Sequence, residues 1–149
     1  METDYTLTDE EFKDVYSKVP RLCVEIIIKT DRGVLMTLRD IEPCKDLWHI
    51  PGGTILYGES IDAAAKRIAK KELGIKVKII GLAGYAEYPS DQKSRGWGWP
   101  IALQIFCNAG SEDFKLDKQA REFKFFKKFS DIPRNIIEEH KKILEKILT

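Results

Sequence analysis

Hydrophobic and polar residues alternate along this chain in stretches whose period separates strands from helices. Runs rich in branched and aromatic residues, bounded by glycine, proline or aspartate, predict strands at 22–28, 34–38, 47–50, about 75–87, 100–107 and 121–127. Apolar residues at helical spacing predict helices over about 9–18, 60–73 and 133–148. Strands and helices interleave without a repeat or a linker. The pattern therefore predicts an α/β fold, a mixed β-sheet sandwiched between α-helices, as one domain over residues 1–149.

The helix predicted over 60–73 carries an acidic residue on its apolar side. Ser60 is suited to cap its start, and Gly74 is suited to end it. At about 100° per residue, Glu72 projects among the apolar side chains, one turn beyond Ile68. A buried carboxylate is costly unless it is paired or binds a metal. Two interpretations stay open: a structural ion pair, for instance with Arg39, or a metal ligand beside a phosphate site.

Composition narrows the function classes. The net charge of +1 over 149 residues gives no electrostatic case for nucleic-acid binding. No apolar stretch is long enough to span a bilayer, and the start Met1-Glu2-Thr3-Asp4 does not resemble a signal peptide. The three cysteines lack CxxC spacing, which fits reduced thiols in a cytoplasm. Only two histidines are present, so the chemistry must come mainly from carboxylates, arginines and backbone.

A spaced motif covers this helix and the loop before it. Gly53, Glu59, Arg67 and Glu72-Leu73-Gly74-Ile75 stand in the frame Gly-x5-Glu-x7-Arg-Glu-U-x-Glu-Glu-x-Gly-U, where U is aliphatic. The chain thereby resembles the Nudix hydrolase family. Two of the family's three helix glutamates are replaced, by Ile68 and Lys71. One remaining carboxylate can anchor at most one Mg²⁺ ion, or Mn²⁺ in its place, with help from phosphate oxygens and water.

One branch of the family, the GDP-mannose mannosyl hydrolases, shares these losses. In that branch, a single Mg²⁺ assists attack of water on the sugar carbon, and GDP leaves with inversion. The resemblance extends from about Leu7 to Phe126. It implies three catalytic or supporting residues, which are Glu25, Arg39 and Arg67. It also places Glu72, Gly53 and Gln119 at the metal.

Three departures from this branch affect the substrate and the base. The histidine that serves the branch as base is Ala120 here, an arginine after the glycine pair is Thr54, and a tyrosine is Pro100. Glu25, Glu122 and His49 are the candidates to act as base instead.

Further residues have both a functional and a structural interpretation. Trp97 and Trp99, with Arg95, are candidates to bind the substrate through aromatic faces, although such a loop can also pack its own tryptophans. His140 lies on the apolar stripe of the last helix, which favours a place in the core or at an interface. The region from which many Nudix proteins supply a further carboxylate, late in the chain, contains Glu112, Asp113 and Glu122.

These observations lead to one leading hypothesis and two others. The leading one is a Mg²⁺-dependent hydrolase of a nucleotide sugar or related nucleoside diphosphate derivative. The second is a Nudix-fold module that binds a nucleotide without turnover. The third is phosphoanhydride hydrolysis with carboxylates from the 110–122 loop. A small-molecule substrate is expected as partner, with no nucleic acid and no membrane. A homodimer through the apolar face of the last helix stays open.

Overall fold

The computed structural model describes residues 7–148, so the N-terminal residues used above for the signal-peptide expectation lie outside it. Four α-helices cover the described chain: α1 (Asp9–Tyr16), α2 (Ile61–Leu73), α3 (Pro89–Arg95) and α4 (Glu138–Ile147). The strands are β1 (Arg21–Thr30), β2 (Gly33–Arg39), β3 (Trp48–His49), β4 (Gly52–Thr54), β5 (Val77–Glu87), β6 (Pro100–Ala109) and β7 (Ala120–Phe126). A 3-10 turn, η1, spans Phe129–Asp131.

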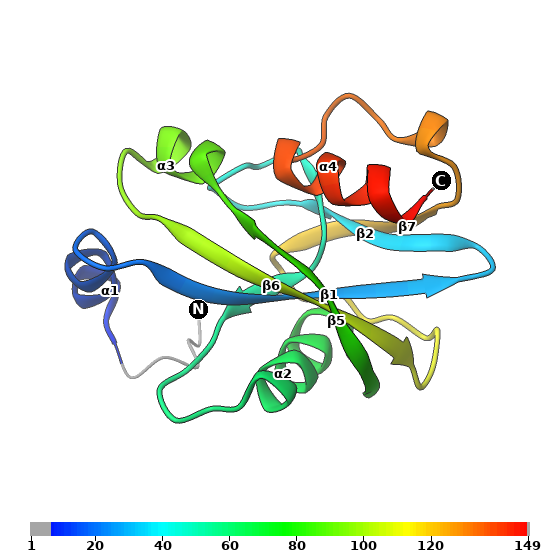
Figure 1. The fold of residues 1–149 in the computed structure, drawn as a ribbon, viewed down its shortest axis with the longest axis horizontal. Helices are drawn as coiled ribbons and strands as arrows, with labels where there is room; N and C mark the ends of the chain where they lie inside the picture. Colours follow the sequence, from blue (N-terminus) through cyan, green and yellow to red (C-terminus); the bar gives the residue numbers. More distant parts are fainter. Residues whose placement is uncertain (1–6, 149) are drawn as a thin grey trace.

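The strands form a mixed sheet in which β1 holds the central place. The main order is β3-β2-β1-β6-β5, with β4 added to β1 and β7 added to β2. β1 runs parallel to β6 and antiparallel to β2 and β4. Figure 1 shows α2 below the strands and α3 and α4 above them. The α/β fold predicted from the sequence, a mixed sheet between helices, is therefore confirmed.

Two hydrophobic cores hold the helices against the strands. The α2 core joins the apolar face of this helix to β1, β5 and β6, and includes Val24, Ile68, Leu73 and Ile105. The α4 core includes Ile27, Met36, Ile50 and Leu144. Since Ile143 and Leu144 are buried there, the apolar face of the last helix is used within the chain. The core interpretation of this face therefore accounts for it without a dimer contact.

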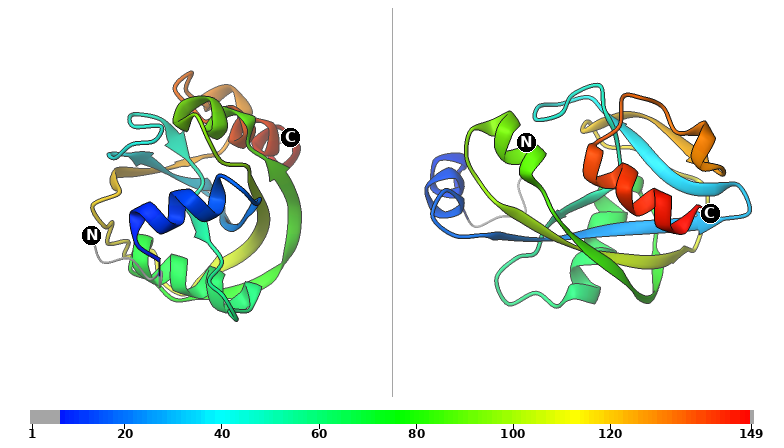
Figure 2. Two further views of the ribbon diagram at one scale, coloured as in Figure 1. Left: turned by 90° about the vertical axis from the view of Figure 1, so that its left-hand side faces the viewer. Right: turned by 45° about the horizontal axis from the view of Figure 1, so that its top comes forward.

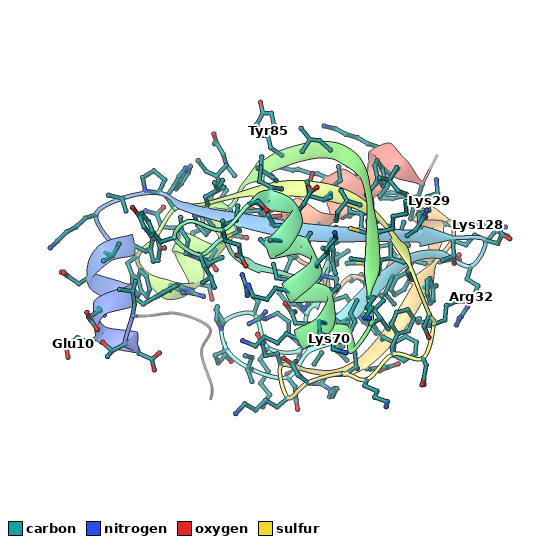
Figure 3. The ribbon with its side chains drawn as sticks, turned by 90° about the horizontal axis from the view of Figure 1, so that it is seen from below. Glu10, Lys29, Arg32, Lys70, Tyr85 and Lys128 are labelled. Atoms are coloured by element: carbon teal, nitrogen blue, oxygen red, sulfur yellow. The ribbon has the colours of Figure 1, made fainter. Side chains whose placement is uncertain are left out.

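Helix α2 follows its sequence pattern closely. The Ser60 hydroxyl accepts a hydrogen bond from the Ala63 amide at 3.1 Å, and Gly74 ends the helix with φ of 66°. Glu72 is buried on the inner side. Figure 3 looks from below, with α2 toward the viewer and Lys70 labelled at one end of it. The cap, the stop and the unusual position of Glu72 were all predicted correctly.

Three local features differ from the prediction. β4 includes Gly52 and Gly53, which were expected to end a strand. It was not predicted because its residues lack an apolar alternation. α3 lies inside the segment predicted as a loop. This helix of 7 residues begins at Pro89, and its polar sequence has no apolar periodicity that would predict it. The last helix starts at Glu138 and not at Pro133, because the preceding segment pairs with β3: the Trp48 amide donates to the Asn135 carbonyl at 2.8 Å.

The described residues also bear on the membrane question. No helix among them is both long and apolar enough to cross a bilayer.

In Figure 2, left, the short helix α1 lies in front of the strand ends. This end of the molecule contains the candidate site.

Candidate active site

A cavity of about 480 Å³ opens where the start of β1, the end of β2, β4, α2, α3 and α4 converge. Its volume falls within the range of sites for small molecules. Most residues singled out from the sequence line it: Glu25, Arg39, His49, Gly53, Arg67, Glu72, Trp97 and Gln119. Trp99 and Glu122 are not among its lining residues.

Glu72 is a buried carboxylate that faces this cavity. Its exposed fraction is 8%, and among residues 7–148 it makes no hydrogen bond or ion pair. Burial, with a smaller effect from the nearby Asp117 carboxylate, raises its pKa to about 8. An unpaired carboxylate in such a place is costly, and a bound cation would offset that cost.

Asp117 is a carboxylate with an electrostatic effect on Glu72 that the sequence interpretation did not single out. It lies in the expected late loop, yet Glu112, Asp113 and Glu122 were singled out in its place. Its carboxylate accepts hydrogen bonds from the backbone and side-chain amides of Gln119, both at 3.0 Å. These bonds connect the predicted residue Gln119 to the carboxylate that acts on Glu72.

Arg39 ends β2 at the same end of the cavity. Its Nε donates to the Pro43 carbonyl at 2.6 Å, which fixes the side chain against the 40–46 loop. No acceptor for its terminal nitrogens is found in the described chain. Burial lowers the pKa of Arg39, and the Glu72 carboxylate opposes that shift. Because arginine stays charged in proteins, this half-buried cation suits a phosphate ligand.

Arg67 supports the loop between β4 and α2. It donates to both carboxylate oxygens of Glu59, at 2.8 and 3.0 Å, and to the Thr54 carbonyl at 2.9 Å. Glu59 in turn accepts from the Leu56 amide at 3.1 Å. These bonds connect Thr54 and Glu59, at the two ends of the loop, to helix α2. Arg67 therefore holds this loop in place.

Glu25 lies at the cavity wall on β1 and accepts hydrogen bonds from three side chains. The Tyr88 hydroxyl lies 2.5 Å from both carboxylate oxygens, and the Gln104 amide donates at 3.3 Å. His140 Nε2 lies 2.5 Å from Oε2. Burial and the Glu25 charge raise the pKa of Tyr88, so its hydroxyl remains a donor. The sequence indicated Glu25 but not these partners, which lie 63 or more positions away along the chain.

The two histidines differ in their partners. His49 Nε2 lies 2.9 Å from the Thr37 hydroxyl, and burial lowers its pKa well below the ordinary value. His140 is buried, as expected from the apolar stripe, but it also lines the cavity. A core position and a polar contact with Glu25 are therefore combined in one residue.

Arg21 is a further cation that the sequence interpretation missed. Its Nη1 donates to the Thr54 hydroxyl at 2.9 Å, and its guanidinium lies 5.5 Å from the Phe12 ring centre. It makes no ion pair within the described residues. The Arg21 charge therefore lies beside Thr54. The GDP-mannose mannosyl hydrolases have an arginine at the position of Thr54.

Trp97 lines the cavity, whereas the late carboxylates singled out from the sequence are exposed outside it. The Trp97 ring already faces Phe12 at 6.2 Å, and the Arg95 and Lys13 cations lie 5.3 and 5.9 Å from the ring centre. Glu122 is exposed on β7. Two other late carboxylates, Glu112 and Asp113, are also exposed, and Glu112 pairs with Arg32 at 3.3 Å.

The donor set fits one divalent ion held jointly with a ligand. In the described part of the chain, no group of three or more histidine, cysteine, aspartate or glutamate side chains is placed to enclose a metal. Mg²⁺ commonly uses one or two protein carboxylates together with waters and substrate phosphates. Glu72, with Gln119 on the same cavity lining, matches that pattern.

Comparison with known proteins identifies the family to which this fold belongs. The fold and the cavity define an α/β protein with a cavity of small-molecule size at one end of the sheet. The model of the NUDIX domain family matches residues 19–146. The chain belongs to the Nudix family.

Two relatives and one solved structure illustrate the range within this family. The chain is 28% identical to the low-salt glycan biosynthesis protein Agl8 of Haloferax volcanii over 80% of its length and 79% of that protein. It is 29% identical to the ADP-ribose pyrophosphatase of Methanocaldococcus jannaschii, over 85% and 72%. The crystal structure of a MutT NUDIX hydrolase from Burkholderia pseudomallei has the same fold, with a TM-score of 0.77 and 21% identity over 87% and 99% of the two chains.

Proposed function

We propose that this protein hydrolyses a nucleoside diphosphate sugar and breaks the bond between the sugar carbon and the diphosphate oxygen. The observation that carries the proposal is that Glu25, Arg39 and Glu72 line one cavity. This reaction needs an acceptor for a water proton, a cation for the diphosphate and a carboxylate that suits a metal ion.

The diphosphate would lie at the end of the cavity formed by Arg39 and Glu72. Nudix hydrolases generally use a divalent metal, and here Glu72, with Gln119 and the Gly53 carbonyl, would hold one Mg²⁺ or Mn²⁺ ion. When bound, the ion would neutralise phosphate charge on the leaving group. Arg39 would bind the diphosphate through the terminal nitrogens that its bond to Pro43 leaves available. Arg67 would keep the glycine loop in place.

Glu25 is the base that we propose. Its three donors supply one proton each to the roughly four lone-pair sites of a carboxylate, and a proton from water would use the fourth, beside the Tyr88 hydroxyl that contacts both oxygens. Water would attack the sugar carbon and pass its proton to Glu25, while the electron pair of the broken bond leaves with the diphosphate. His49 is less suited because its Nε2 already contacts Thr37. Glu122 lies outside the cavity lining.

The names of the two relatives support a sugar-containing substrate. One is described as a glycan biosynthesis protein, and the other as a pyrophosphatase of ADP-ribose, which is itself a nucleoside diphosphate sugar. GDP-mannose is the first candidate because of the resemblance to the mannosyl hydrolase branch. Trp97, Arg95 and Arg21 would contact the part of the substrate that lies away from Glu72.

Hydrolysis of the phosphoanhydride bond is the second candidate. It is favoured by Asp117, a second carboxylate whose charge raises the pKa of Glu72 and whose hydrogen-bond partner Gln119 lines the cavity. If Asp117 also reached the cation, the two carboxylates would support attack at phosphorus better than Glu72 alone.

A substrate panel tests the proposal. The protein and a Glu72→Gln variant are incubated with GDP-mannose, UDP-glucose, ADP-ribose and nucleoside triphosphates, with Mg²⁺, and products are separated by chromatography. We expect free sugar and nucleoside diphosphate, lost in the variant. Release of nucleoside monophosphate would favour the second candidate. Ligand binding by calorimetry without any Glu72-dependent product would overturn hydrolysis and leave a binding module.

A further inference from the structure

The last helix brings a histidine to the proposed base. His140 lies 115 positions from Glu25 in sequence, yet its Nε2 lies 2.5 Å from Glu25 Oε2. The histidine has an exposed fraction of only 2%, and both residues line the cavity. Such a contact ties α4 to the cavity wall formed by β1.

The second ring nitrogen of His140 determines where the proton lies. Nδ1 lies 2.9 Å from the backbone nitrogen of Ile50. A backbone N–H can only donate, so Nδ1 must accept, and the ring proton lies on Nε2. His140 therefore donates to Glu25 and has no free nitrogen with which to take a proton from water.

The surroundings of the ring prevent it from turning. The His49 ring stacks on it at 6.2 Å, and the Tyr88 ring meets it edge-on at 5.5 Å. The neighbouring Glu139 accepts hydrogen bonds from the backbone amide and the hydroxyl of Ser90, which fixes α4 against α3. Packing and hydrogen bonds thus hold the Nε2–H of His140 in one direction, toward Glu25.

We propose that His140 is a positioning residue for Glu25. By holding Oε2, together with the Tyr88 hydroxyl, it directs the remaining lone pair of the carboxylate into the cavity. The proposal rests on the proposed function, because positioning matters only if Glu25 accepts a proton from water. It also makes α4 part of the active site and not only a cover of the core. Groups that orient a reacting residue in this way contribute through geometry and not through binding of substrate.

Nuclear magnetic resonance tests the contact without any need for activity. The chain has two histidines, so ¹⁵N-labelled imidazole gives two sets of ring signals, and His140→Gln assigns them. We expect one ring with an unprotonated Nδ1 and a protonated Nε2 whose proton is shifted far downfield. In Glu25→Gln, that proton should move upfield while the His49 signals stay in place. A protonated Nδ1, or His140 signals unchanged in Glu25→Gln, would overturn the proposal.

Kinetics tests the consequence for the reaction. In His140→Leu, kcat should fall by about 10- to 100-fold with KM unchanged, as expected for loss of one hydrogen bond to a charged group. His140→Gln keeps an N–H donor and should recover part of kcat. Ile143→Val, on the same helix and away from Glu25, controls for weaker packing of α4 and should keep kcat.

The outcomes separate the two proposals. Unchanged kcat in His140→Leu, or a rise in KM alone, would contradict the positioning role. If His140→Leu does not fold, His140→Gln and the spectra still decide, since neither depends on that variant. If the wild-type protein turns over no substrate, the proposed function fails, and the Glu25→Gln spectra still show whether His140 orients the carboxylate.

Discussion

At the scale of single residues, the cavity contains two buried glutamates with opposite surroundings. Glu25 accepts hydrogen bonds from three side chains, whereas Glu72 has no partner in the described chain. Burial and Asp117 raise the pKa of Glu72 to about 8 from an ordinary value of 4.5. The first glutamate is held in one orientation by its donors, and the second is the one that would receive a cation under the proposed function.

Glu72→Gln should remove a pH-dependent loss of stability. The folded state favours protonated Glu72, because its folded-state pKa lies above the unfolded value. The stabilisation of the fold by protonated Glu72 is therefore fully present below pH 4.5 and is lost as pH rises to about 8. Thermal melts without divalent ions should therefore show the variant gaining stability relative to wild type between these pH values. Added Mg²⁺ should raise the melting temperature of wild type only, since a ligand of the folded state stabilises it. Parallel pH curves for the two proteins would contradict this assignment.

Arg39 should act through the shape of its guanidinium as well as its charge. Arg39→Gln should lower kcat/KM by about 10- to 100-fold, because hydrogen bonds to a charged phosphate are lost. Arg39→Lys should recover only a small part, since a lysine cannot keep the bond to Pro43 and contact a diphosphate with two donors. Steady-state kinetics with the best substrate measures both, and full activity of the lysine variant would argue against a forked contact.

The site residues predicted from the spacing of the motif are those close together in sequence, whereas Glu25, Arg39 and Gln119 were predicted only through the family resemblance. Glu72, Gly53 and Arg67 belong to one motif on one loop and helix, so their proximity follows from helical geometry. Tyr88 and His140 were missed as site residues because α3 and α4 reach Glu25 through tertiary packing. No short-range pattern encodes that contact.

At the scale of secondary structure, the approach of β4 to β1 positions Glu25. A Cβ at Gly52 would lie 2.7 Å from the Val24 carbonyl oxygen and 2.9 Å from Glu25 Cγ. A Cβ at Gly53 would meet only Ile68 side-chain atoms, at 3.6 Å. Gly52 and Gly53 therefore belong to a strand whose first residue must be glycine for packing.

Gly52→Ala and Gly53→Ala form a matched pair. The first should destabilise the fold by about 1–3 kcal/mol through overpacking and displace the Glu25 side chain. The second should change the free energy of unfolding little, since its added methyl group makes an ordinary contact. Chemical denaturation measures both, and equal losses would show that the close approach of β4 does not limit this position.

At the scale of the whole molecule, two cores on opposite sides of the strands support the cavity between them. α2 carries Glu72 and packs in one core, and α4 carries His140 and packs in the other. The sequence predicted this layered arrangement because amphipathic periods specify which faces are buried. β5, in contrast, presents large exposed side chains, and Tyr85 projects outward from it in Figure 3.

Core packing below α4 should matter far more than the outer face of β5. Leu144→Ala should lower the free energy of unfolding by about 2–5 kcal/mol, because this side chain is fully buried. Ile80→Ala, at a position with an exposed fraction of 61%, should have a small effect. Urea unfolding of the two variants checks this, and similar losses would contradict the assignment of α4 to the core.

The central claim concerns the bond that breaks, and isotopic labelling tests it most directly. The protein is allowed to hydrolyse GDP-mannose, or the best substrate of the panel, in ¹⁸O-labelled water with Mg²⁺, and the products are weighed by mass spectrometry. Attack at carbon predicts label in the free sugar and none in the nucleoside diphosphate, with the reaction lost in Glu25→Gln. Label in a phosphate product would contradict this account.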